Sequence, residues 1–517
     1  MAVPADPTIE EEDEDVEEEE EEHGGRTHHP SAPSHEFFDL STTVDPSYII
    51  SSIRKLLPSG SASHSHSSFN GVALDGSEQG SLTNNKEEGA AVSACCDNDE
   101  HVKSSSKNMD VDDCGEFSHQ DSGSISVGEE AWEESGCVLW DLAASKTHAE
   151  LMVENFILEV LVANLTVCKS PRVTEISIGI IGNLACHEVP MKRIVSTEGL
   201  IEIIVDKLFL DDPQCLCETC RLLAVGLQSG ESIMWAEALQ SEHILCQILW
   251  IAENTLNLQL IEKSISLIVA ILESHQKVVD TLLPPMMKLG LGSILISLLN
   301  FETSKLTSER IPERYSILEL ILRAIEALSV IDDHSQEICS SKELFQLVCD
   351  LVKFPDKVEV GNCCVTTAIL IANILSDFDD HVSEISHDLG LLGGLLDIFP
   401  FASNDMEARN ALWNVIARIM VRIRETEMSP SSVYHYVSLF VSKIDLIEDE
   451  LLDQRMVSSS DEQPRLPPAD ARKTSLRRII SILNQWTAAK ENNVNAEVLV
   501  NETDVKRLLD CCHRFLK

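Results

Sequence analysis

The sequence predicts an all-α protein, an α-solenoid of stacked helical units behind a disordered acidic N-terminal arm. Apolar residues recur at helical spacing from about residue 135 almost to the last residue, and no alternating strand pattern interrupts them. Hydrophobic residues make up 44% of the chain and aromatic ones only 5%, so Leu and Ile supply most of the core and favour helix. In addition, one apolar helix recurs at a nearly constant interval, which is the signature of a repeat architecture.

The recurring helix is anchored on Asn183 in the segment IGIIGNLAC. An interval of about 40–47 residues is the armadillo and HEAT period. Between anchors, a short helix, a turn and a longer helix complete the three-helix armadillo unit. Because such a unit must stack on its neighbours to bury its apolar face, we expect an armadillo-like array over 131–440. The matching anchors are Gly226, Ile271, Ala327, Asn373 and Arg418, at successive intervals of 43, 45, 56, 46 and 45 residues.

The longest interval contains the polar stretch NFETSKLTSERIPER, residues 300–314, which we expect as an insertion in a loop. Residues 441–517 are less regular, since the Pro-rich break in RLPPADARKTSLRRIISILNQW precedes another apolar helix. We expect this segment to form a C-terminal helical cap, because the end of a solenoid needs a unit with a polar outer face.

The N-terminal quarter of the chain has a different composition. The net charge of the chain is −47, and residues 10–22, EEEDEDVEEEEEE, are acidic except for Val16. Residues 59–130 are rich in Ser, Gly, Asn and Asp. Neither segment can bury enough apolar surface to offset its chain entropy. We therefore expect a disordered acidic arm over 1–44 and a disordered low-complexity linker over 59–130.

Between these two segments, the stretch DPSYIISSIRKLLP, residues 45–58, predicts a short amphipathic helix. Asp45 suits the N-cap, Pro46 suits the first helical position, and Pro58 ends the helix. Such a helix docks either onto the folded domain of its own chain or onto a partner protein, and the sequence leaves both alternatives open. The apolar face of this docking helix consists of Ile49, Ile50, Ile53, Leu56 and Leu57.

Charge and targeting features limit the partners and the compartment. A chain this acidic is repelled by nucleic acid and by anionic membrane surfaces. We therefore expect protein partners, among them ones with basic segments, and no direct binding of nucleic acid or membrane; the oligomeric state stays open. The N-terminus lacks the apolar core of a secretory signal, and no apolar run reaches the ~18–20 residues of a membrane helix. These features predict a location in the nucleus or cytoplasm, no secretion, and reduced thiols for the 16 cysteines.

Three segments resemble a named family. They are GCVLWDLAASKTHAELMVENF (136–156), PRVTEISIGIIGNLAC (171–186) and DDPQCLCETCRLLAVGLQSGESIMW (211–235), which are similar to the serum-amyloid-A-like 1 (SAAL) family. The resemblance implies an armadillo-like, non-enzymatic and largely nuclear protein that is loosely linked to cell growth or proliferation. It supplies no catalytic residues. The chain departs from the family by its longer Ser/Asn/Asp-rich arm and by the insertion at 300–314.

Motifs that would carry chemistry are weak in this sequence. CLCETC places Cys215, Cys217 and Cys220 close together, but a structural zinc site needs four ligands, usually in two halves, and no second half is near. Small core residues are the better interpretation of these cysteines. The phosphate-binding patterns GxxxxGK[ST] and GxGxxG, the GxSxG elbow and HExxH are absent. We expect no enzymatic activity, no catalytic residue, no cofactor and no metal.

The sequence DDHSQEI at 332–338 returns as DDHVSEI at 379–385, and its Asp-Asp-His looks like a duplicated metal or acid/base site. The two copies are 47 residues apart, which is one repeat period, and each follows an anchor helix. We therefore expect the aspartates to cap the short first helix of successive units, where negative charge is favourable. Ile338 and Ile385 are expected to point inward.

Armadillo arrays grip extended peptides along the third helix of each unit, where an Asn amide can both donate and accept hydrogen bonds to a peptide backbone. Asn183 and Asn373 occupy equivalent anchor positions and Arg418 occupies another, but the intervening units break this Asn ladder. Trp250 and Asn254 give one WxxxN match of the import-receptor type. We expect the tryptophans in the core, except that an exposed one would be a binding anchor. These five residues are the candidates for a protein-binding groove.

The sequence therefore favours a non-enzymatic protein-interaction scaffold. The alternative is a histone-chaperone-like acidic acceptor, in which the Glu/Asp run of residues 10–22 binds the partner and the solenoid is only a platform. Phosphorylation would add negative charge to the polar segments. The candidate phosphosites are Ser122 and Ser126 in DSGSIS, which fits a phosphodegron pattern, and Ser458 and Ser459, which like Ser126 precede an acidic residue by three positions.

Overall fold

A computed structural model describes the chain over 44–58, 127–378, 380–423, 428–457, 469–491 and 500–516. The contacts separate residues Met1–Asp45 from a compact unit, Pro46–Lys517, in which all the helices below lie. Every regular element in the described ranges is a helix, so the predicted all-α class is confirmed.

Several sequence predictions fall outside the described residues. These are the acidic arm except for its last residue, and the linker over 59–126. The candidate phosphosites Ser122, Ser126, Ser458 and Ser459 also lie outside them.

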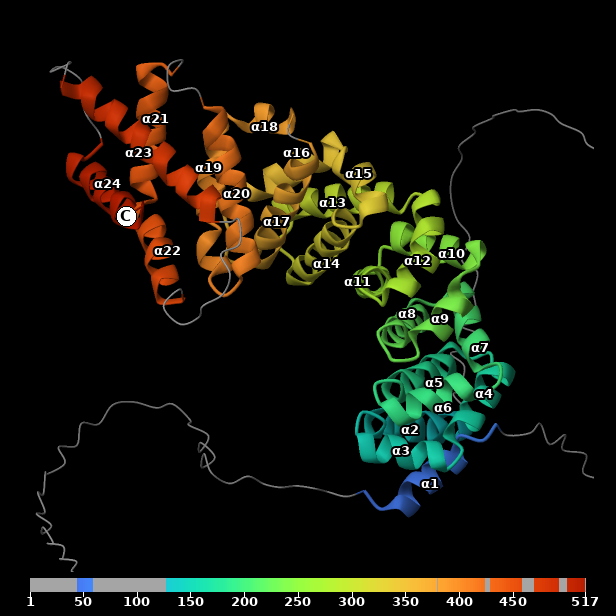
Figure 1. Cartoon of the computed structure of the whole chain (residues 1–517). Coiled ribbons are helices and arrows are strands. Elements are labelled where there is room, and N and C mark those ends of the chain that lie inside the picture. Colours follow the sequence, from blue (N-terminus) through green and yellow to red (C-terminus); the bar gives the residue numbers. More distant parts are fainter. Residues whose placement is uncertain are drawn as a thin grey trace, which may run out of the picture. The chain divides into compact units, whose positions relative to one another are not determined.

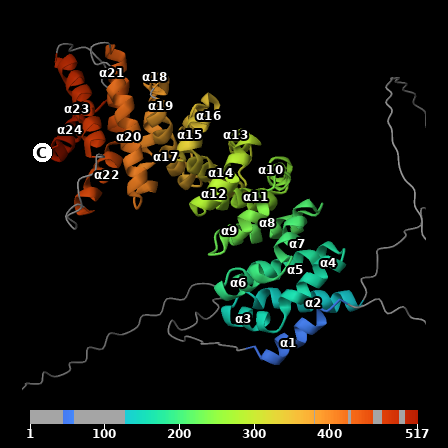
Figure 2. The same cartoon turned by 45° about the vertical axis from the view of Figure 1, so that its right-hand side comes forward.

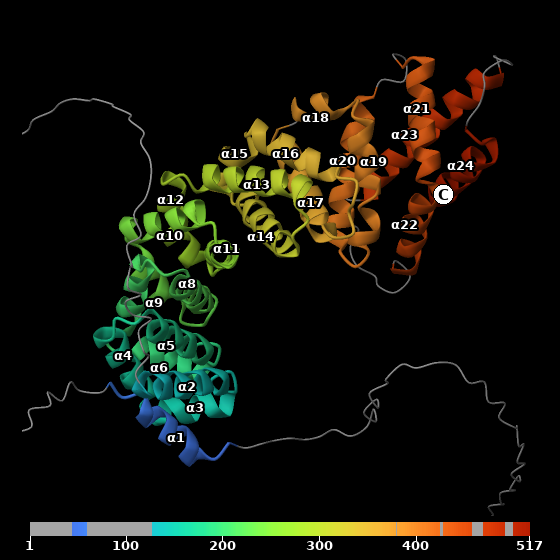
Figure 3. The same ribbon diagram turned by 180° about the vertical axis from the view of Figure 1, so that it is seen from behind.

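The main feature of the unit is a row of helices in which each packs against the next along the chain (Figure 1). Six of them close a three-helix unit, and the outer two extend the row at its ends. Figure 3 shows the same order from behind. This third-helix row consists of α2 (Val127–Leu142), α5 (Pro171–Leu184), α8 (Pro213–Leu227), α11 (Leu258–Leu272), α14 (Pro312–Ser329), α17 (Gly361–Asp377), α20 (Met406–Arg422) and α23 (Ala469–Glu491).

The other two helices of each unit precede it in the chain, and the predicted armadillo-type solenoid is thereby confirmed. The first helices are α3 (Lys146–Glu154), α6 (Glu188–Ser196), α9 (Ser232–Leu239), α12 (Gln276–Lys288), α15 (Asp332–Cys339) and α18 (Asp380–Ile385). The second helices are α4 (Ile157–Val167), α7 (Leu200–Asp206) with η1 (Lys207–Phe209), α10 (Glu242–Asn254), α13 (Leu291–Ser308), α16 (Lys342–Val352), and α19 (Leu389–Leu396) with η2 (Phe399–Ala402).

Local sequence signals fix where many of the third helices begin. Proline occupies the first turn of α5, α8 and α14, where its missing N–H costs nothing. Asp212 caps α8 by accepting a hydrogen bond from the Cys215 amide at 2.9 Å. Asn257 caps α11 and Asp405 caps α20 in the same way, because each side chain accepts a hydrogen bond from the backbone amide three residues later. These caps fix the register of the helices that carry the candidate site.

At the C-terminal end, α21 (Pro430–Ser442) and α24 (Glu502–Leu516) pack against α23 and against each other, and α22 (Ile444–Val457) packs against α24 and η2 (Figure 2). The element boundaries differ from the expected ones in two places. The first helix of the row, α2, begins inside the range 59–130 that we expected as linker, and α21 crosses the expected boundary at residue 440. Because α23 packs on α20, it continues the repeat array inside the segment expected as a cap.

The short amphipathic helix is present as α1 (Pro46–Lys55), and it packs against α2 and α3. Ile49, Ile53 and Leu56 are buried, whereas Ile50 is half-buried and Leu57 is exposed. The carbonyl of Leu56 accepts hydrogen bonds from the Trp132 indole at 3.1 Å and from the Asn164 amide at 2.9 Å. The apolar face of α1 therefore lies against the domain of its own chain.

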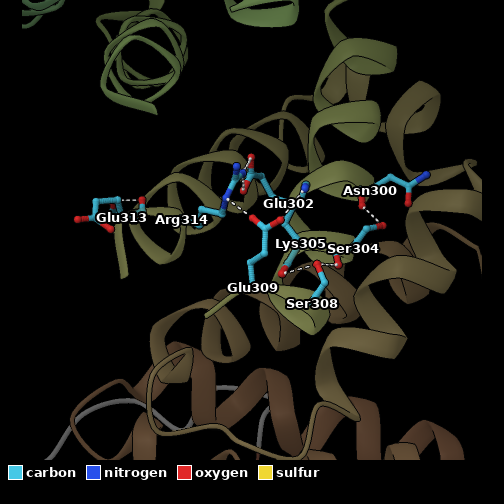
Figure 4. A network of polar contacts seen from close by, with 9 residues as sticks. Asn300, Glu302, Ser304, Lys305, Ser308, Glu309, Glu313 and Arg314 are labelled. Atoms are coloured by element: carbon cyan, nitrogen blue, oxygen red, sulfur yellow. Dashed lines mark hydrogen bonds and ion pairs between the residues drawn. The ribbon is translucent and has the colours of Figure 1, made fainter. Parts of the chain in front are cut away.

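The insertion at 300–314 is mostly helical, so the prediction of a loop is wrong. Helix α13 continues to Ser308, and α14 begins at Pro312. The stretch contains no Gly or Pro before Pro312. Glu302 is 1% exposed, and both of its carboxylate oxygens accept hydrogen bonds at 2.9 Å from Arg314 of α14 (Figure 4). This ion pair across the turn holds the extended end of α13 against α14.

The repeated DDH motifs lie on the first helices of successive units, α15 and α18. Asp332 and Asp333 form the first turn of α15, but the N-cap position is Ile331, so the prediction that they cap the helix is wrong in position. Their charge still lies at the positive end of the helix. Ile338 and Ile385 are buried. His381 is buried in a ring stack with Phe345 at 4.6 Å between centroids, and Asp379 lies outside the described residues.

Among the residues that the structure describes, no single helix is long and apolar enough to cross a membrane. Only α12 and α13 taken together meet the length and composition criteria, and they are bent by 74° at their junction.

Candidate protein-binding surface

The predicted ladder residues bond to the preceding repeat. The Asn183 amide donates to the carbonyl of Trp140 at 2.9 Å, and the Asn373 amide donates to the Ser329 hydroxyl at 2.9 Å. These acceptors lie near the C-terminal ends of α2 and α14. The carbonyl of Trp140 is among the last of its helix, which have no partner within the helix. Both bonds join one repeat to the next.

The third predicted ladder residue, Arg418, also bonds to the preceding repeat. The guanidinium of Arg418 donates to the carbonyl of Leu375, near the end of α17, at 2.7 Å. Where the Asn ladder is broken, another side chain can bond to the preceding repeat. The Ser274 hydroxyl, for example, donates to the carbonyl of Leu227 at 3.0 Å. Asn183, Asn373 and Arg418 are only half-buried, so part of each side chain is accessible.

The WxxxN residues do not lie in the third-helix row. Trp250 and Asn254 are on α10, a second helix, and the Asn254 amide donates to the carbonyl of Trp250 at 2.9 Å within that helix. The match therefore does not extend the ladder. Trp250 is nonetheless 56% exposed, whereas Trp235 in the same unit is fully buried, so Trp250 meets the criterion of an exposed tryptophan anchor.

The third-helix row is hollowed where α17, α20 and α23 meet. One hollow of about 450 Å³ lies between α17 and α20, and a second of about 500 Å³ lies between α20 and α23. The two share Asn414 and Arg418, so they adjoin. Their polar lining residues are Asn373, Ser376, Glu407, Asn410, Asn414, Arg418, Arg422 and Thr474.

Four of these side chains form one stripe along α20. Asn410, Asn414, Arg418 and Arg422 are spaced by four residues, which places them on one face of the helix. Sequence reasoning identified only Arg418. The four-residue spacing of the two asparagines before it was a visible signal, because it extends the anchor position along the same face.

Carboxylates surround the start of the stripe. Burial raises the pKa of Glu326 on α14, and the nearby carboxylates of Glu407 and Glu273 raise it further, while Arg323 opposes them. The guanidinium of Arg323 is engaged by Glu273. The middle of the third-helix row is thus acidic, and it adjoins the end of the row that carries Arg418 and Arg422.

The three cysteines of CLCETC lie on α8, and their side chains are buried. Burial raises the pKa of each of the Cys215, Cys217 and Cys220 thiols to about 12. The thiolate is the form that binds metal or reacts, so these groups stay protonated at neutral pH. Among the described residues, no group of three or more His, Cys, Asp or Glu side chains is placed to hold a metal ion.

We therefore expect alkylation at neutral pH to separate two classes of cysteine. Cys186 and Cys246 are exposed and should react with iodoacetamide in the folded chain. Cys215, Cys217 and Cys220 should react only after unfolding, because they are buried and protonated. Mass spectrometry of the alkylated peptides measures this difference, and rapid modification of Cys217 in the folded chain would contradict it.

Comparison with known proteins supports the predicted relationship. No family model matches the chain. The chain is 25% identical over 300 residues to Protein saal1 of Danio rerio, a match that covers 54% of this chain and 62% of that protein. It is 31% identical over 149 residues to Protein SAAL1 of Homo sapiens, covering 28% of this chain and 31% of that protein. The chain thus spans less than two thirds of these curated relatives.

Designed and engineered proteins are among the solved structures with a similar arrangement. A designed armadillo repeat protein in complex with the peptide (KR)4 is 15% identical, with a TM-score of 0.39, and the match covers 48% of this chain and 95% of that one. An engineered protein is 15% identical with a TM-score of 0.40, covering 75% of this chain and 95% of that one.

Proposed function

The chain is related to the SAAL1 proteins and folds as an armadillo-type solenoid, and from this premise we propose that it is a non-enzymatic scaffold that binds partner proteins along its third-helix row. The observation that carries the proposal is the polar stripe of α20, which lines two adjoining hollows. A row of parallel units offers side chains at a regular spacing to an extended segment of a partner. The absence of catalytic sequence motifs supports a binding role.

Replacing the two asparagines of the stripe tests this proposal. Asn410 and Asn414 carry amides that can pair with both the N–H and the C=O of a peptide. Replacing both with Ala should lower the affinity for a purified partner by about tenfold or more and leave unfolding unchanged. The partner is first identified by affinity purification of the full-length chain, and binding is then measured by calorimetry.

A matched control is Asn300→Ala, which removes an exposed asparagine from the second helix α13. It should bind the partner like the unmodified chain. Wild-type affinity in the N410A/N414A variant would overturn the assignment of binding to the third-helix row.

The acidic run of residues 10–22 favours a second candidate function, a histone-chaperone-like acceptor of basic proteins. Removing residues 1–40 separates the two functions. Partners that survive the deletion bind the solenoid, and partners that are lost bind the run. Partners with basic segments are proposed on the net charge of −47, and their binding should weaken with salt.

We also propose a location in the nucleus or cytoplasm, which rests on the sequence features given above and on the family resemblance, and a loose link to cell growth, which rests on the resemblance alone. Imaging of the full-length chain carrying a fluorescent tag tests the location. Accumulation in a secretory compartment would contradict it.

A further inference from the structure

The exposed side of the second helix α10 carries an aromatic side chain that the core does not use. Trp250 follows two buried residues, Ile248 and Leu249, and is itself 56% exposed. The exposed side chains of His243 and Cys246 share its face of the helix, because the three positions are three and four residues apart. An aromatic and apolar surface thus faces outward from α10.

The position of Trp250 is polar in the neighbouring units. The second helices α7, α13 and α16 show the same pattern, in which two buried residues are followed by an exposed one. That exposed residue is Asp206 in α7, Asn300 in α13 and Asp350 in α16. A polar side chain therefore meets the needs of the fold at this position, and packing does not explain the tryptophan.

A second aromatic ring extends this surface towards the preceding unit. Phe209 in η1 is 40% exposed, and its ring stacks on that of His243 with 4.7 Å between the centroids. We call Phe209, His243, Cys246 and Trp250 the Trp250 face. Figure 1 shows α7 and α10 to the right of α8 and α11, so this face belongs to a different side of the solenoid from the third-helix row.

Carboxylates border the Trp250 face. Glu253 lies one turn after Trp250, Glu242 lies one turn before Cys246, and both are exposed on a helix without Lys or Arg. Asp206, directly before η1, is also exposed. None of these carboxylates has an ion-pair partner among the residues that the structure describes. The neighbouring Lys207 is directed to the preceding unit, where its ammonium donates to a carbonyl of α4 at 2.9 Å.

We propose that the Trp250 face binds a segment of a partner protein in which Lys or Arg alternates with aliphatic side chains. The inference goes beyond the proposed function, because it concerns a second surface on other helices. A cation is attracted to the face of an indole ring. The aliphatic stems of Lys and Arg cover apolar surface while their charged ends reach outward, here to the bordering carboxylates. An exposed tryptophan is also a frequent centre of binding energy.

The charge of the chain disfavours the other occupants of such a surface. A second copy would bring further carboxylates against Glu242 and Glu253, since the net charge is −47. The acidic run of residues 10–22 of the same chain would be repelled in the same way. An anionic membrane surface and a nucleic acid carry the wrong sign as well. A basic partner is the one that the border attracts.

The test uses fluorescence anisotropy of labelled peptides that repeat Lys-Leu-Ser, Glu-Leu-Ser or Lys-Ser-Ser, with the full chain. We expect the Lys-Leu-Ser peptide to bind about tenfold or more tightly than either of the others at about 150 mM salt. Equal binding of Glu-Leu-Ser would show apolar contact without charge selection, and equal binding of Lys-Ser-Ser would show attraction to acidic residues alone. Either result would overturn the proposal.

Trp250→Ala shows whether the peptide binds at this face. It should lower the affinity for the Lys-Leu-Ser peptide by about tenfold or more. The control is Val358→Ala, which shortens a side chain that is 78% exposed in the turn between α16 and α17 and should leave the affinity unchanged. Wild-type affinity in the Trp250 variant would refute the assignment.

The carboxylates are tested by the E242Q/E253Q variant, which should bind the Lys-Leu-Ser peptide more weakly and with less dependence on salt. E198Q/E337Q removes the same charge from exposed positions before α7 and on α15, and it should bind like the unmodified chain. An equal loss in both variants would show a general charge effect and count against the proposal.

The exposed thiol of Cys246 reports directly on occupancy of the face. A saturating amount of the Lys-Leu-Ser peptide should slow its alkylation by iodoacetamide, while Cys186, which is exposed before α6, should react at an unchanged rate. Undiminished alkylation of Cys246 would place the peptide elsewhere. The N410A/N414A variant should bind this peptide normally, so the third-helix row and the Trp250 face can each fail without the other.

Discussion

Replacing Glu450 with Ala is expected to destabilise the C-terminal part of the solenoid by about 3–5 kcal/mol, the usual cost of removing one partner of a buried ion pair. Glu450 is 4% exposed and Arg409 3% exposed. The carboxylate of Glu450 accepts hydrogen bonds from Arg409 Nε at 2.8 Å and from the Trp413 indole at 3.0 Å. It therefore connects α22 to two positions on α20.

A second buried cation, Arg472, should increase the destabilisation that the loss of Glu450 causes. Burial lowers the pKa of Arg472, and the carboxylate of Glu450 opposes that shift. The Arg472 guanidinium lies 5.8 Å from the Trp413 ring centroid and 5.4 Å from that of Phe515. Without Glu450, its carboxylate would no longer offset the repulsion between the buried guanidinium groups of Arg409 and Arg472.

The effect should be local, because each repeat of a solenoid contacts only its neighbours. Hydrogen exchange measured by mass spectrometry should rise in peptides from α20 to α24 and stay unchanged in α5 and α8. Glu450→Gln should be milder, since it keeps an acceptor for Trp413. The control is Asp449→Ala at the exposed neighbouring position, which should change stability by less than about 0.5 kcal/mol. Equal effects at 449 and 450 would contradict the buried network.

Replacing Trp235 with Ala should cost about 3–5 kcal/mol, as expected for a large aromatic side chain in a core. The Trp235 ring is fully buried. It fills the space that Gly226 leaves, since a Cβ at that position would lie 2.6 Å from the ring. Its indole nitrogen has no hydrogen-bond partner among the described residues, so the loss is one of packing.

Trp250→Ala is the matched control, because Trp250 belongs to the same unit but is 56% exposed. We expect a change in stability below about 0.5 kcal/mol. Urea unfolding followed by circular dichroism measures both variants. If Trp250 is a binding anchor, its replacement should instead weaken partner binding. A large loss of stability at Trp250 would show that its indole is buried in solution.

Much of the fold follows from local signals that the sequence displays openly. Helical periodicity fixes the all-α class, and the spacing of the anchors near 45 residues fixes the solenoid. Caps such as Asp212 and Asn257 lie next to the helices they begin. The insertion at 300–314 was misjudged because its polar composition is also typical of loops. Its helix is held by the pairing of Glu302 with Arg314 in the next helix.

The candidate site was also only partly predictable, because its contacts depend on side chains from neighbouring helices. The repeat period identifies Asn183 and Asn373 as equivalent, but it does not say that their amides bond to Trp140 and Ser329 one unit earlier. The WxxxN pair matched a pattern of the third helix, yet Trp250 lies on a second helix. A pattern of residue types does not specify which row a helix joins.

By itself the sequence determined the class of the protein, its repeat period and the positions that recur from unit to unit, because these depend on residues close together in the chain. Only the tertiary structure decided which recurring side chains join repeats and which remain at the surface. It also brought Arg418 and Arg422 of α20 and Thr474 of α23 around one hollow, although more than 50 residues separate Thr474 from both arginines. The physical reason is that stacking places residues one period apart side by side, and the partners of a hydrogen bond or ion pair are set by that stacking.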